Sequence, residues 1–281
     1  MLSTLIPSKL KSIFREKINE YILNHDIVKD LQNQVKECKI HSEQLQDALR
    51  RYHDLDVPPP MLLQKRVVGD YYGDFIESGF RMINDFQHAL MKADKKVEDF
   101  NSVLDFGCGC GRVIMAMHKS FPQLKISGSD IDEEAIEYCK KAYSSFGDFQ
   151  VNPHNPPSLF ADNSFDFIYG ISVFTHLPEE MQFNWLRDLK RISKKGAYLF
   201  LTVENEKCNR YLNSKQLAEL SNNGFYFYEG RLTEGLPDFY RMAFHSHDYV
   251  RNNWSKYFEI IDIIPLGMGN HQDVILCKNN G

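Results

Sequence analysis

The chain has 281 residues, of which 25% are charged and 43% hydrophobic, and its formal net charge is −5. This length allows one large domain or two small ones, and the ordinary composition excludes disordered, collagen-like and disulfide-dense proteins. The slight acidity argues against a dedicated nucleic-acid-binding protein, because such domains are usually basic.

The N-terminal sequence has neither a long apolar segment nor a small-residue cleavage site, so we expect no secretory leader. No run of about 18 apolar residues occurs, and no membrane-spanning helix is therefore expected. The six cysteines include no CxxC pair, which excludes a zinc or redox motif of that spacing. Because no leader is expected, we expect a cytoplasmic protein with reduced thiols. Residues 1–17 are basic and carry an apolar stripe of Leu10, Ile13 and Phe14. This stripe either touches a membrane surface weakly or packs on the protein's own body.

Residues 8–55 contain no glycine and follow a heptad pattern with several polar interruptions. The pattern predicts a long helix, or two helices broken near residues 24–26, within an N-terminal arm of residues 1–56. This arm either forms a coiled coil that makes a homodimer or docks on the domain that follows. The a and d positions are Leu10, Phe14, Lys17, Tyr21, Asn24, Val28, Leu31, Val35, Cys38, Ser42, Leu45, Leu49 and Tyr52.

The triple proline at residues 58–60 is expected to end the arm, because three prolines cannot continue a helix. Residues 57–281 then form the main domain, and apolar residues at helical spacing predict a first helix over 74–92. From residue 101 onward, short apolar runs alternate with amphipathic helices. The predicted strands are 103–106, 125–130, 149–151, 165–171 and 197–203, and the predicted helices between them are 111–120, 132–145 and 178–193.

The alternation of strands and helices indicates an α/β fold, with a parallel sheet wound by helices on both faces. The C-terminal part differs, because residues 258–266 and 272–277 read as two strands joined by a short Gly-Met-Gly-Asn turn. Such a glycine-bearing connection predicts an antiparallel hairpin.

The strongest motif runs from Val103 to Arg112, where a buried strand leads through a turn with glycine at every second position into a helix. The glycines allow close approach of the backbone to a ligand, and the helix N-terminus offers free N–H donors. Asp130 ends the next strand, 23 residues after Gly107. An acid at that distance suits the hydroxyl groups of a ribose.

Two common nucleotide sites are excluded by the same segment. A nicotinamide-binding turn needs a third glycine where this chain has Arg112, and a P-loop needs a Gly-Lys-Ser/Thr that does not follow. Asp105 stands two residues before Gly107 and would be a poor neighbour for a pyrophosphate. It suits a ligand that carries a cationic ammonium group.

The segments DFGCGCGR, GSDID, NSFDFIYGISVFTHL and LKRIS with GAYLFLTV occur in this order. In these motifs, residues 57–278 resemble the class I S-adenosylmethionine-dependent methyltransferases. Within this family, the chain most resembles bacterial members of small-molecule and glycan pathways. The resemblance implies a doubly wound, mostly parallel seven-stranded sheet with an antiparallel final strand. It also implies S-adenosylmethionine as cofactor and a small-molecule or glycan acceptor, methylated at oxygen rather than nitrogen. The alternatives are a protein or RNA methyltransferase and a non-catalytic module that binds the nucleoside.

The resemblance also assigns roles by motif position. Asp105 would bind the methionine ammonium group, and Arg112 would either meet the methionine carboxylate or remain a surface charge. Asp130 would accept the ribose hydroxyl groups, and Asp132 is expected to cap the following helix. The other positions assigned to the cofactor are Gly107 and Gly109 in the loop, Ile131 and Asn152 at the adenine, and Ser172 and Val173 at the sulfonium end.

Ligands bind beyond the carboxyl ends of the strands in such a sheet, and the hairpin turn at 267–272 returns to that edge. His176, Glu204 and His271 are therefore candidates for a base that takes a proton from the acceptor. Alternatively, His176 caps a helix, and the other two are solvated.

An insertion at 205–248 is expected to cover the acceptor pocket, with Ser246 as the N-cap of a helix. The aromatic residues of this insertion, called the cap below, either stack on a sugar or flat ring or pack the cap onto the sheet. The sequence contains no recognisable metal-binding cluster. The aromatic residues in question are Phe225, Tyr226, Phe227, Tyr228, Phe239 and Tyr240.

Overall fold

The computed structural model divides the chain into two compact units, Met1–His53 and Asp54–Gly281. The structure describes residues 12–13, 15–18, 29, 31, 34–35, 59–68, 75–204, 212–228 and 237–281.

The described residues of the first unit are helical. Among the heptad positions, Lys17, Leu31 and Val35 are described; the proposed break at 24–26 and most of residues 1–17 lie outside the described residues. The coiled coil and the membrane-surface contact therefore stay predictions. The large apolar side chains that the described residues expose in this unit, between 46% and 55%, are Ile13, Ile18, Leu31 and Val35.

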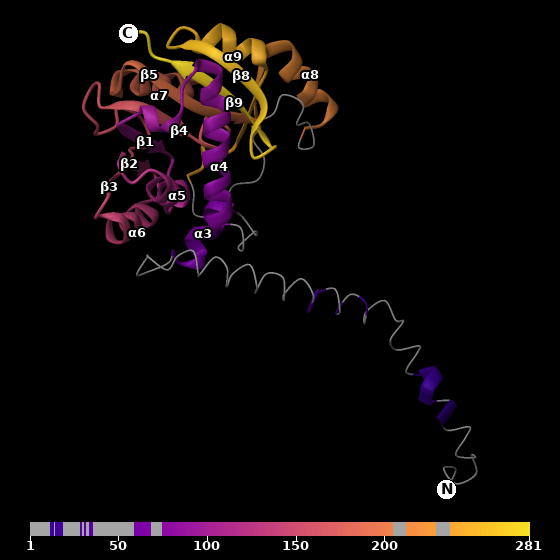
Figure 1. The fold of residues 1–281 in the computed structure, drawn as a ribbon. Coiled ribbons are helices and arrows are strands. Elements are labelled where there is room, and N and C mark those ends of the chain that lie inside the picture. Colours follow the sequence, from indigo (N-terminus) through magenta and orange to yellow (C-terminus); the bar gives the residue numbers. More distant parts are fainter. Residues whose placement is uncertain are drawn as a thin grey trace. The chain divides into compact units, whose positions relative to one another are not determined.

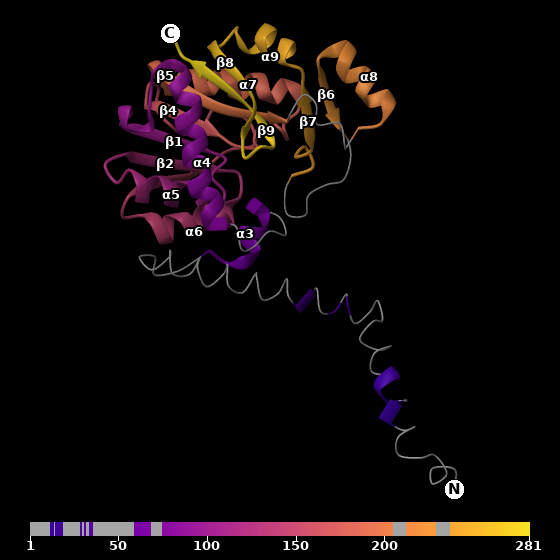
Figure 2. The ribbon, with the colours of Figure 1, turned by 45° about the vertical axis from the view of Figure 1, so that its right-hand side comes forward.

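The second unit is built on a seven-stranded sheet with the order β3-β2-β1-β4-β5-β9-β8. The pairs from β3 to β5 are parallel, whereas β9 runs antiparallel to both β5 and β8. Figures 1 and 2 show helices on both sides of the sheet, so the predicted doubly wound fold with an antiparallel final strand is confirmed. The strands of the sheet are β1 (Ser102–Phe106), β2 (Lys125–Asp130), β3 (Gly147–Val151), β4 (Phe165–Gly170), β5 (Ser193–Glu204), β8 (Glu259–Met268) and β9 (Gln272–Lys278).

The side chains of the central strands alternate between two layers of helices, as the two-residue period of a strand requires. On one side, Phe86 of α4 (Phe75–Leu90) lies 4.7–5.9 Å, between ring centroids, from three aromatic rings of β4 and β5. On the other side, Trp185 of α7 (Glu179–Ile192) packs on Phe106 at 4.9 Å. The other described helices of this unit are α3 (Met61–Val68), α5 (Arg112–Ser120), α6 (Glu133–Tyr143), α8 (Ser214–Asn223) and α9 (His247–Trp254), with short 3-10 helices at Met91–Ala93 and Val97–Asp99.

Two helices begin at the capping residues that the sequence predicts. The Asp132 carboxylate accepts a hydrogen bond from the backbone nitrogen of Ala135 at 3.2 Å, which caps α6. The Ser246 hydroxyl accepts one from the backbone nitrogen of Tyr249 at 3.1 Å, which caps α9. Each cap satisfies an N–H group that the helix cannot pair internally.

Helix α3 was not predicted from the sequence, which suggested only that the prolines end the arm. The helix begins directly after Pro60, whose carbonyl oxygen accepts hydrogen bonds from the backbone nitrogens of Leu63 at 2.9 Å and Gln64 at 3.1 Å. The Gln64 side chain donates to the Pro59 carbonyl at 2.8 Å. The carbonyl groups of Pro59 and Pro60 therefore serve the start of a helix.

The insertion after β5 forms a small layer of its own, with α8 and a two-stranded antiparallel sheet of β6 (Phe225–Tyr228) and β7 (Met242–His245) (Figure 2). The four consecutive aromatic residues of the insertion, at 225–228, form β6, while β7 was not predicted. The backbone nitrogen of Ala243 donates to the Thr175 carbonyl at 2.7 Å. The cap is thus bonded to the loop that follows β4.

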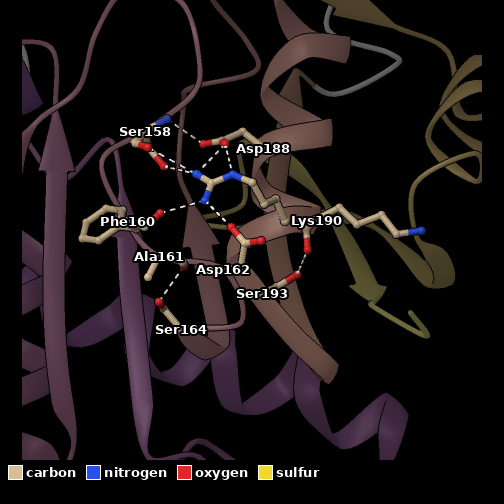
Figure 3. A network of polar contacts seen from close by, with 9 residues as sticks. Ser158, Phe160, Ala161, Asp162, Ser164, Asp188, Lys190 and Ser193 are labelled. Atoms are coloured by element: carbon tan, nitrogen blue, oxygen red, sulfur yellow. Dashed lines mark hydrogen bonds and ion pairs between the residues drawn. The ribbon is translucent and has the colours of Figure 1, made fainter.

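The loop between β3 and β4 is fastened to α7 by one arginine, in the network of Figure 3. The Arg191 guanidinium donates to Asp188 Oδ1 at 2.8 Å, to Asp162 Oδ1 at 2.7 Å and to the Phe160 carbonyl at 2.8 Å. The other carboxylate oxygen of Asp188 accepts from the backbone nitrogen of Ser158 at 2.9 Å. Because several bonds converge on one guanidinium, the loop leaves the end of β3 along a fixed path.

Arg191→Met is expected to lower the free energy of unfolding by ~2–3 kcal/mol, because it leaves the buried Asp188 carboxylate without its ion pair. Urea unfolding followed by circular dichroism measures this loss. Arg187→Met is the matched control on the same helix, since Arg187 is exposed and donates to the nearby Asn184 side chain at 2.9 Å. Equal effects of the two substitutions would contradict the fastening role of Arg191.

Candidate functional site

A pocket of about 1130 Å³, its open mouth included, lies where β1 to β4 end. Its wall is formed by the glycine turn and the loops after β2, β3 and β4, with α3 on one side and a cap segment on another. All nine residues that the sequence assigned to the cofactor line this pocket. They are Asp105, Gly107, Gly109, Arg112, Asp130, Ile131, Asn152, Ser172 and Val173.

The glycine turn is tightly enclosed. Gly107 has a φ of +86° and Gly109 one of +52°, conformations that glycine adopts without strain. A Cβ atom on Gly107 would lie 2.3 Å from Val173 Cγ2, and one on Gly109 would lie 2.7 Å from Val67 Cγ2. The backbone nitrogen of Gly107 donates to the Ser129 carbonyl at 2.7 Å. Neither glycine position therefore has room for a side chain.

Asp105 lies at the end of β1 on the pocket floor. It is 3% exposed, and its Oδ2 has no hydrogen-bond partner among the described residues. Burial raises the pKa of Asp105 to about 8, and the charge of Asp130 acts in the same direction, against the Tyr169 hydroxyl and Arg112. A buried carboxyl group of this kind is stabilised by a cationic partner.

Asp130 anchors the turn as well as lining the pocket. Its Oδ2 accepts from the backbone nitrogen of Gly109 at 2.7 Å, and its Oδ1 accepts from that of Asp132 at 2.9 Å. Burial raises the pKa of Asp130, while these backbone donors act against that shift. The carboxylate can still accept from a further donor. Arg66 of α3 pairs with Asp132 at 2.7 Å and with Glu134 at 3.0 Å, which holds α3 beside this loop.

Aromatic and amide side chains form the opposite wall. Asn152, only 6% exposed, follows β3. The His154 ring meets Phe239 of the cap edge to face, with 5.4 Å between centroids, and Tyr240 lines the pocket beside it. Two of the aromatic cap residues in the sequence prediction therefore reach the pocket.

Several lining residues were not predicted. Leu63, Arg66 and Val67 come from α3, which carried no capping or periodic signal in the sequence. Trp185 comes from α7, where it looks like any other core residue of an amphipathic helix. Arg112, which was predicted, lines the pocket and donates from Nη1 to the Ser78 hydroxyl at 3.3 Å.

The structure does not bring His176 into the pocket wall. Its Nδ1 donates to the Arg241 carbonyl at 3.0 Å, and its ring stacks on Tyr240 at 4.2 Å between centroids. Burial lowers the pKa of His176 to about 4, which makes it a weak base. It does not cap α7 either, since Pro178 holds the N-cap position. His176 instead fastens the cap to the loop after β4.

The other two candidate bases also lie outside the lining residues. Glu204 is 4% exposed, pairs with Gln272 across β5 and β9, and is therefore buried rather than solvated. His271 is exposed in the hairpin turn, where its backbone nitrogen donates to the Met268 carbonyl at 3.0 Å. Both residues lie near the predicted edge of the sheet, but their side chains do not line the pocket.

Within the described ranges, no cluster of three or more histidine, cysteine or acidic side chains could hold a metal ion. No helix in the same ranges has the length and apolar content needed to cross a bilayer. Of the cysteines that the structure describes, Cys108, Cys110, Cys139 and Cys277 are buried free thiols.

Comparison with known proteins matches residues 103–196 to the family model of a methyltransferase domain. The chain is 36% identical over 67 residues to the ubiquinone/menaquinone biosynthesis C-methyltransferase UbiE of Desulfotalea psychrophila, covering 24% of this chain and 27% of that protein. It is 26% identical over 105 residues to the tRNA N(3)-methylcytidine methyltransferase trm141 of Schizosaccharomyces pombe, covering 35% of this chain and 42% of that protein.

Among solved structures, the geranyl diphosphate C-methyltransferase of Streptomyces coelicolor, crystallised with S-adenosyl-L-homocysteine, is similar with a TM-score of 0.50. The identity is 11%, over 80% of this chain and 85% of that chain, so the likeness concerns the fold. The matched stretches span 25–42% of the length of the curated relatives. Residues 103–196 thus match a methyltransferase domain, and the sheet that contains them has the fold seen in the geranyl diphosphate C-methyltransferase.

Proposed function

We propose that this chain binds S-adenosylmethionine in the pocket and transfers its methyl group to a small-molecule or glycan acceptor, at oxygen rather than nitrogen. The observation that carries the proposal is the buried Asp105 carboxyl group, whose Oδ2 has no hydrogen-bond partner among the described residues. An ammonium group would supply the missing donor and charge. Asp130, at the end of the neighbouring strand, lines the same pocket and would accept hydrogen bonds from the ribose hydroxyl groups.

The remaining assignments follow the motif positions. Gly107 and Gly109 would let the turn approach the cofactor, since neither has a side chain in that space. Arg112 would meet the methionine carboxylate. The positions left for the adenine are Ile131 and Asn152, and those for the sulfonium end are Ser172 and Val173.

When bound, S-adenosylmethionine supplies an electrophilic methyl group, so the acceptor needs alignment more than activation. Phe239, Tyr240 and His154 form an aromatic wall that would exclude water from the nucleoside. His176 and His271 are not proposed as bases, because neither lines the pocket among the described residues. Positioning by the pocket wall is the proposed source of the rate enhancement.

The choice of a small acceptor is supported by charge and by the pocket wall. The chain carries a net charge of −5, which disfavours a polyanionic RNA. The cap contributes the uncharged rings of Phe239 and Tyr240 to the pocket. Curated relatives include both the quinone-pathway enzyme and the tRNA enzyme named above, so an RNA acceptor is the competing proposal.

Titration calorimetry on the full chain tests cofactor choice. We expect binding of S-adenosylmethionine and S-adenosylhomocysteine and no heat with NAD. Binding of NAD without binding of the two sulfur ligands would overturn the proposal.

Methyl transfer tests the step beyond binding. The full chain is incubated with methyl-labelled S-adenosylmethionine and, separately, a small-molecule extract, a sugar-nucleotide panel and total tRNA, and products are read by mass. We expect label in a small molecule of the first two pools. Label in the tRNA alone would establish the RNA alternative, and binding without transfer to any pool would favour the non-catalytic module.

Cofactor binding is expected to release up to about one proton near pH 7, because Asp105 is protonated there in the free protein and the ammonium group favours its charged form. With a pKa of about 8 in the free protein, the release should fade once the pH rises above that value. Calorimetry in two buffers with different ionisation enthalpies measures it. The same release from Asp105→Asn would assign the proton to another group.

A further inference from the structure

Ser172 is held in an unusual backbone conformation at the pocket. It follows β4 with a φ of +57°, in the left-handed region that residues with a Cβ rarely adopt. Its backbone nitrogen donates to the Thr202 hydroxyl of β5 at 2.8 Å, and Thr202 is fully buried. Among the described lining residues of the pocket, Ser172 alone combines a side chain with a positive φ. Strain of this kind persists where the surrounding structure enforces it, often at functional positions.

The Ser172 hydroxyl is held by the first residue of the final strand. Gln272 is 5% exposed, and its Nε2 lies 2.9 Å from Ser172 Oγ. The same nitrogen lies 3.4 Å from Oε1 of Glu204, the residue directly opposite Gln272 in the pairing of β5 and β9. Three strand ends therefore meet in one buried polar row that stops at the pocket.

The chemistry of this row sets the direction of its hydrogen bonds. An amide nitrogen only donates, so Gln272 Nε2 donates one of its hydrogens to Oε1 of Glu204. The second hydrogen of that nitrogen is then donated to Ser172 Oγ. Because Ser172 accepts from Gln272, its own hydrogen is the one left to donate. Gln272 Oε1, 3.1 Å from Ser172 Oγ, can receive this hydrogen when no other acceptor is present.

We propose that Gln272 and Glu204 are positioning residues that present the Ser172 hydroxyl as a hydrogen-bond donor to the methyl acceptor. This inference rests on the proposed methyl transfer. A cationic sulfonium group has little use for a donated hydrogen bond, so the donor serves the acceptor. The acceptor must then carry a lone-pair atom beside its reacting centre, such as a carbonyl oxygen, a hydroxyl oxygen or a ring nitrogen, and a plain hydrocarbon is excluded. Glu204 acts through Gln272 and is not itself a base.

Four single variants of the full chain test this row: Ser172→Gly, Ser172→Ala, Gln272→Leu and Glu204→Gln. Calorimetry gives their affinities for S-adenosylmethionine and S-adenosylhomocysteine, and labelled-methyl transfer into the small-molecule extract gives their rates. Loss of one preorganised donor is expected to slow transfer about 10- to 100-fold in the first three variants. Gln272→Leu lies outside the pocket lining and should keep both cofactor affinities within about twofold of the parent chain. Glu204→Gln keeps an acceptor oxygen beside Gln272 and should retain transfer within about fivefold.

Two comparisons separate positioning from other roles. Ser172→Gly relieves the positive φ and Ser172→Ala keeps it, so equal loss of transfer in both assigns the effect to the hydroxyl group rather than to strain. Ser193→Ala removes a buried hydroxyl at the opposite end of β5 and should change neither quantity.

The results separate failure of the Ser172 donor role from failure of the proposed methyl transfer. Full transfer by Ser172→Gly would overturn the donor role, and a loss of about 10²–10⁴-fold in Glu204→Gln would show that Glu204 is a base. A larger loss of S-adenosylmethionine than of S-adenosylhomocysteine affinity in the Ser172 variants would assign the hydroxyl to the sulfonium instead. A parent chain that transfers no methyl group to any pool would refute the proposed function, and the row with it.

Discussion

Asp105→Asn is expected to weaken S-adenosylmethionine binding by about 2–3 kcal/mol, or roughly 30- to 150-fold in Kd. The substitution keeps the shape of the side chain and removes the charge that would pair with the ammonium group. Since Asp105 is 3% exposed, water does not replace the lost interaction. Titration calorimetry measures the change.

The same variant should leave the fold intact and make it more stable at high pH. The pKa of Asp105 in the folded protein is about 8, above its value of about 4 in an unfolded chain. The folded state therefore holds the proton more strongly, and the parent chain loses stability as the pH rises from about 4 to about 8, with no further loss from this group above that. Asp105→Asn lacks this loss, which urea unfolding at several pH values would reveal.

A matched control separates the pocket carboxylate from acids of the sheet in general. Asp166 lies at the other end of β4 and accepts hydrogen bonds from the backbone nitrogens of Asn101 at 3.1 Å and Ser102 at 2.8 Å. Asp166→Asn keeps an acceptor oxygen and should not change cofactor affinity. If the two substitutions weaken binding equally, Asp105 is not the ammonium partner.

That the residues assigned to the cofactor would share one pocket could be predicted, because each one lies at the end of a parallel strand, in the loop after it or at the start of the next helix. Parallel strands β1 to β4 end at one edge, so residues near those ends meet without any further information. Asp105 and Asp130, 25 positions apart in the sequence, become neighbours because β1 and β2 pair in parallel register. The order of the motifs along the chain was therefore enough to predict which of these residues share the pocket.

The candidate bases show where this reasoning fails. A strand end fixes the position of a residue but not where its side chain points. Glu204 is turned toward Gln272 by the pairing of β5 with β9, and His176 is turned toward the Arg241 carbonyl by a strand of the cap. Both partners, Gln272 and Arg241, are distant in the sequence, and no local sequence pattern predicts these contacts. Tertiary pairing decided these orientations.

Helix α3 and strand β7 were missed for a related reason. The eight residues of α3 include no capping side chain, and the carbonyl oxygen of Pro60 serves the first turn instead. The four residues of β7 have too short a pattern to identify a strand, and their partner β6 precedes a long connection. Both elements nevertheless position pocket residues, Val67 in one case and Tyr240 in the other.

Gly107→Ala is expected to lower the free energy of unfolding by ~2–5 kcal/mol and to displace the turn that holds the cofactor. Part of the loss, ~1–2 kcal/mol, comes from forcing a residue with a Cβ into a φ of +86°. A further ~1–3 kcal/mol comes from overpacking, because the new Cβ would lie 2.3 Å from Val173 Cγ2. Val173 is branched at Cβ and has few rotamers in which to move away.

The chain supplies an internal control for these two contributions. Gly196 has nearly the same φ, +85°, and a Cβ on it would meet no atom within 4 Å. Gly196→Ala should therefore show the conformational cost alone, and the difference between the two variants in urea unfolding isolates the contact with Val173. In the Val173→Ala background, that difference should shrink by most of the overpacking cost, since the clashing methyl group is gone. If Gly107→Ala costs no more than Gly196→Ala, the turn has space for a side chain, and its glycines are required only for their backbone conformation.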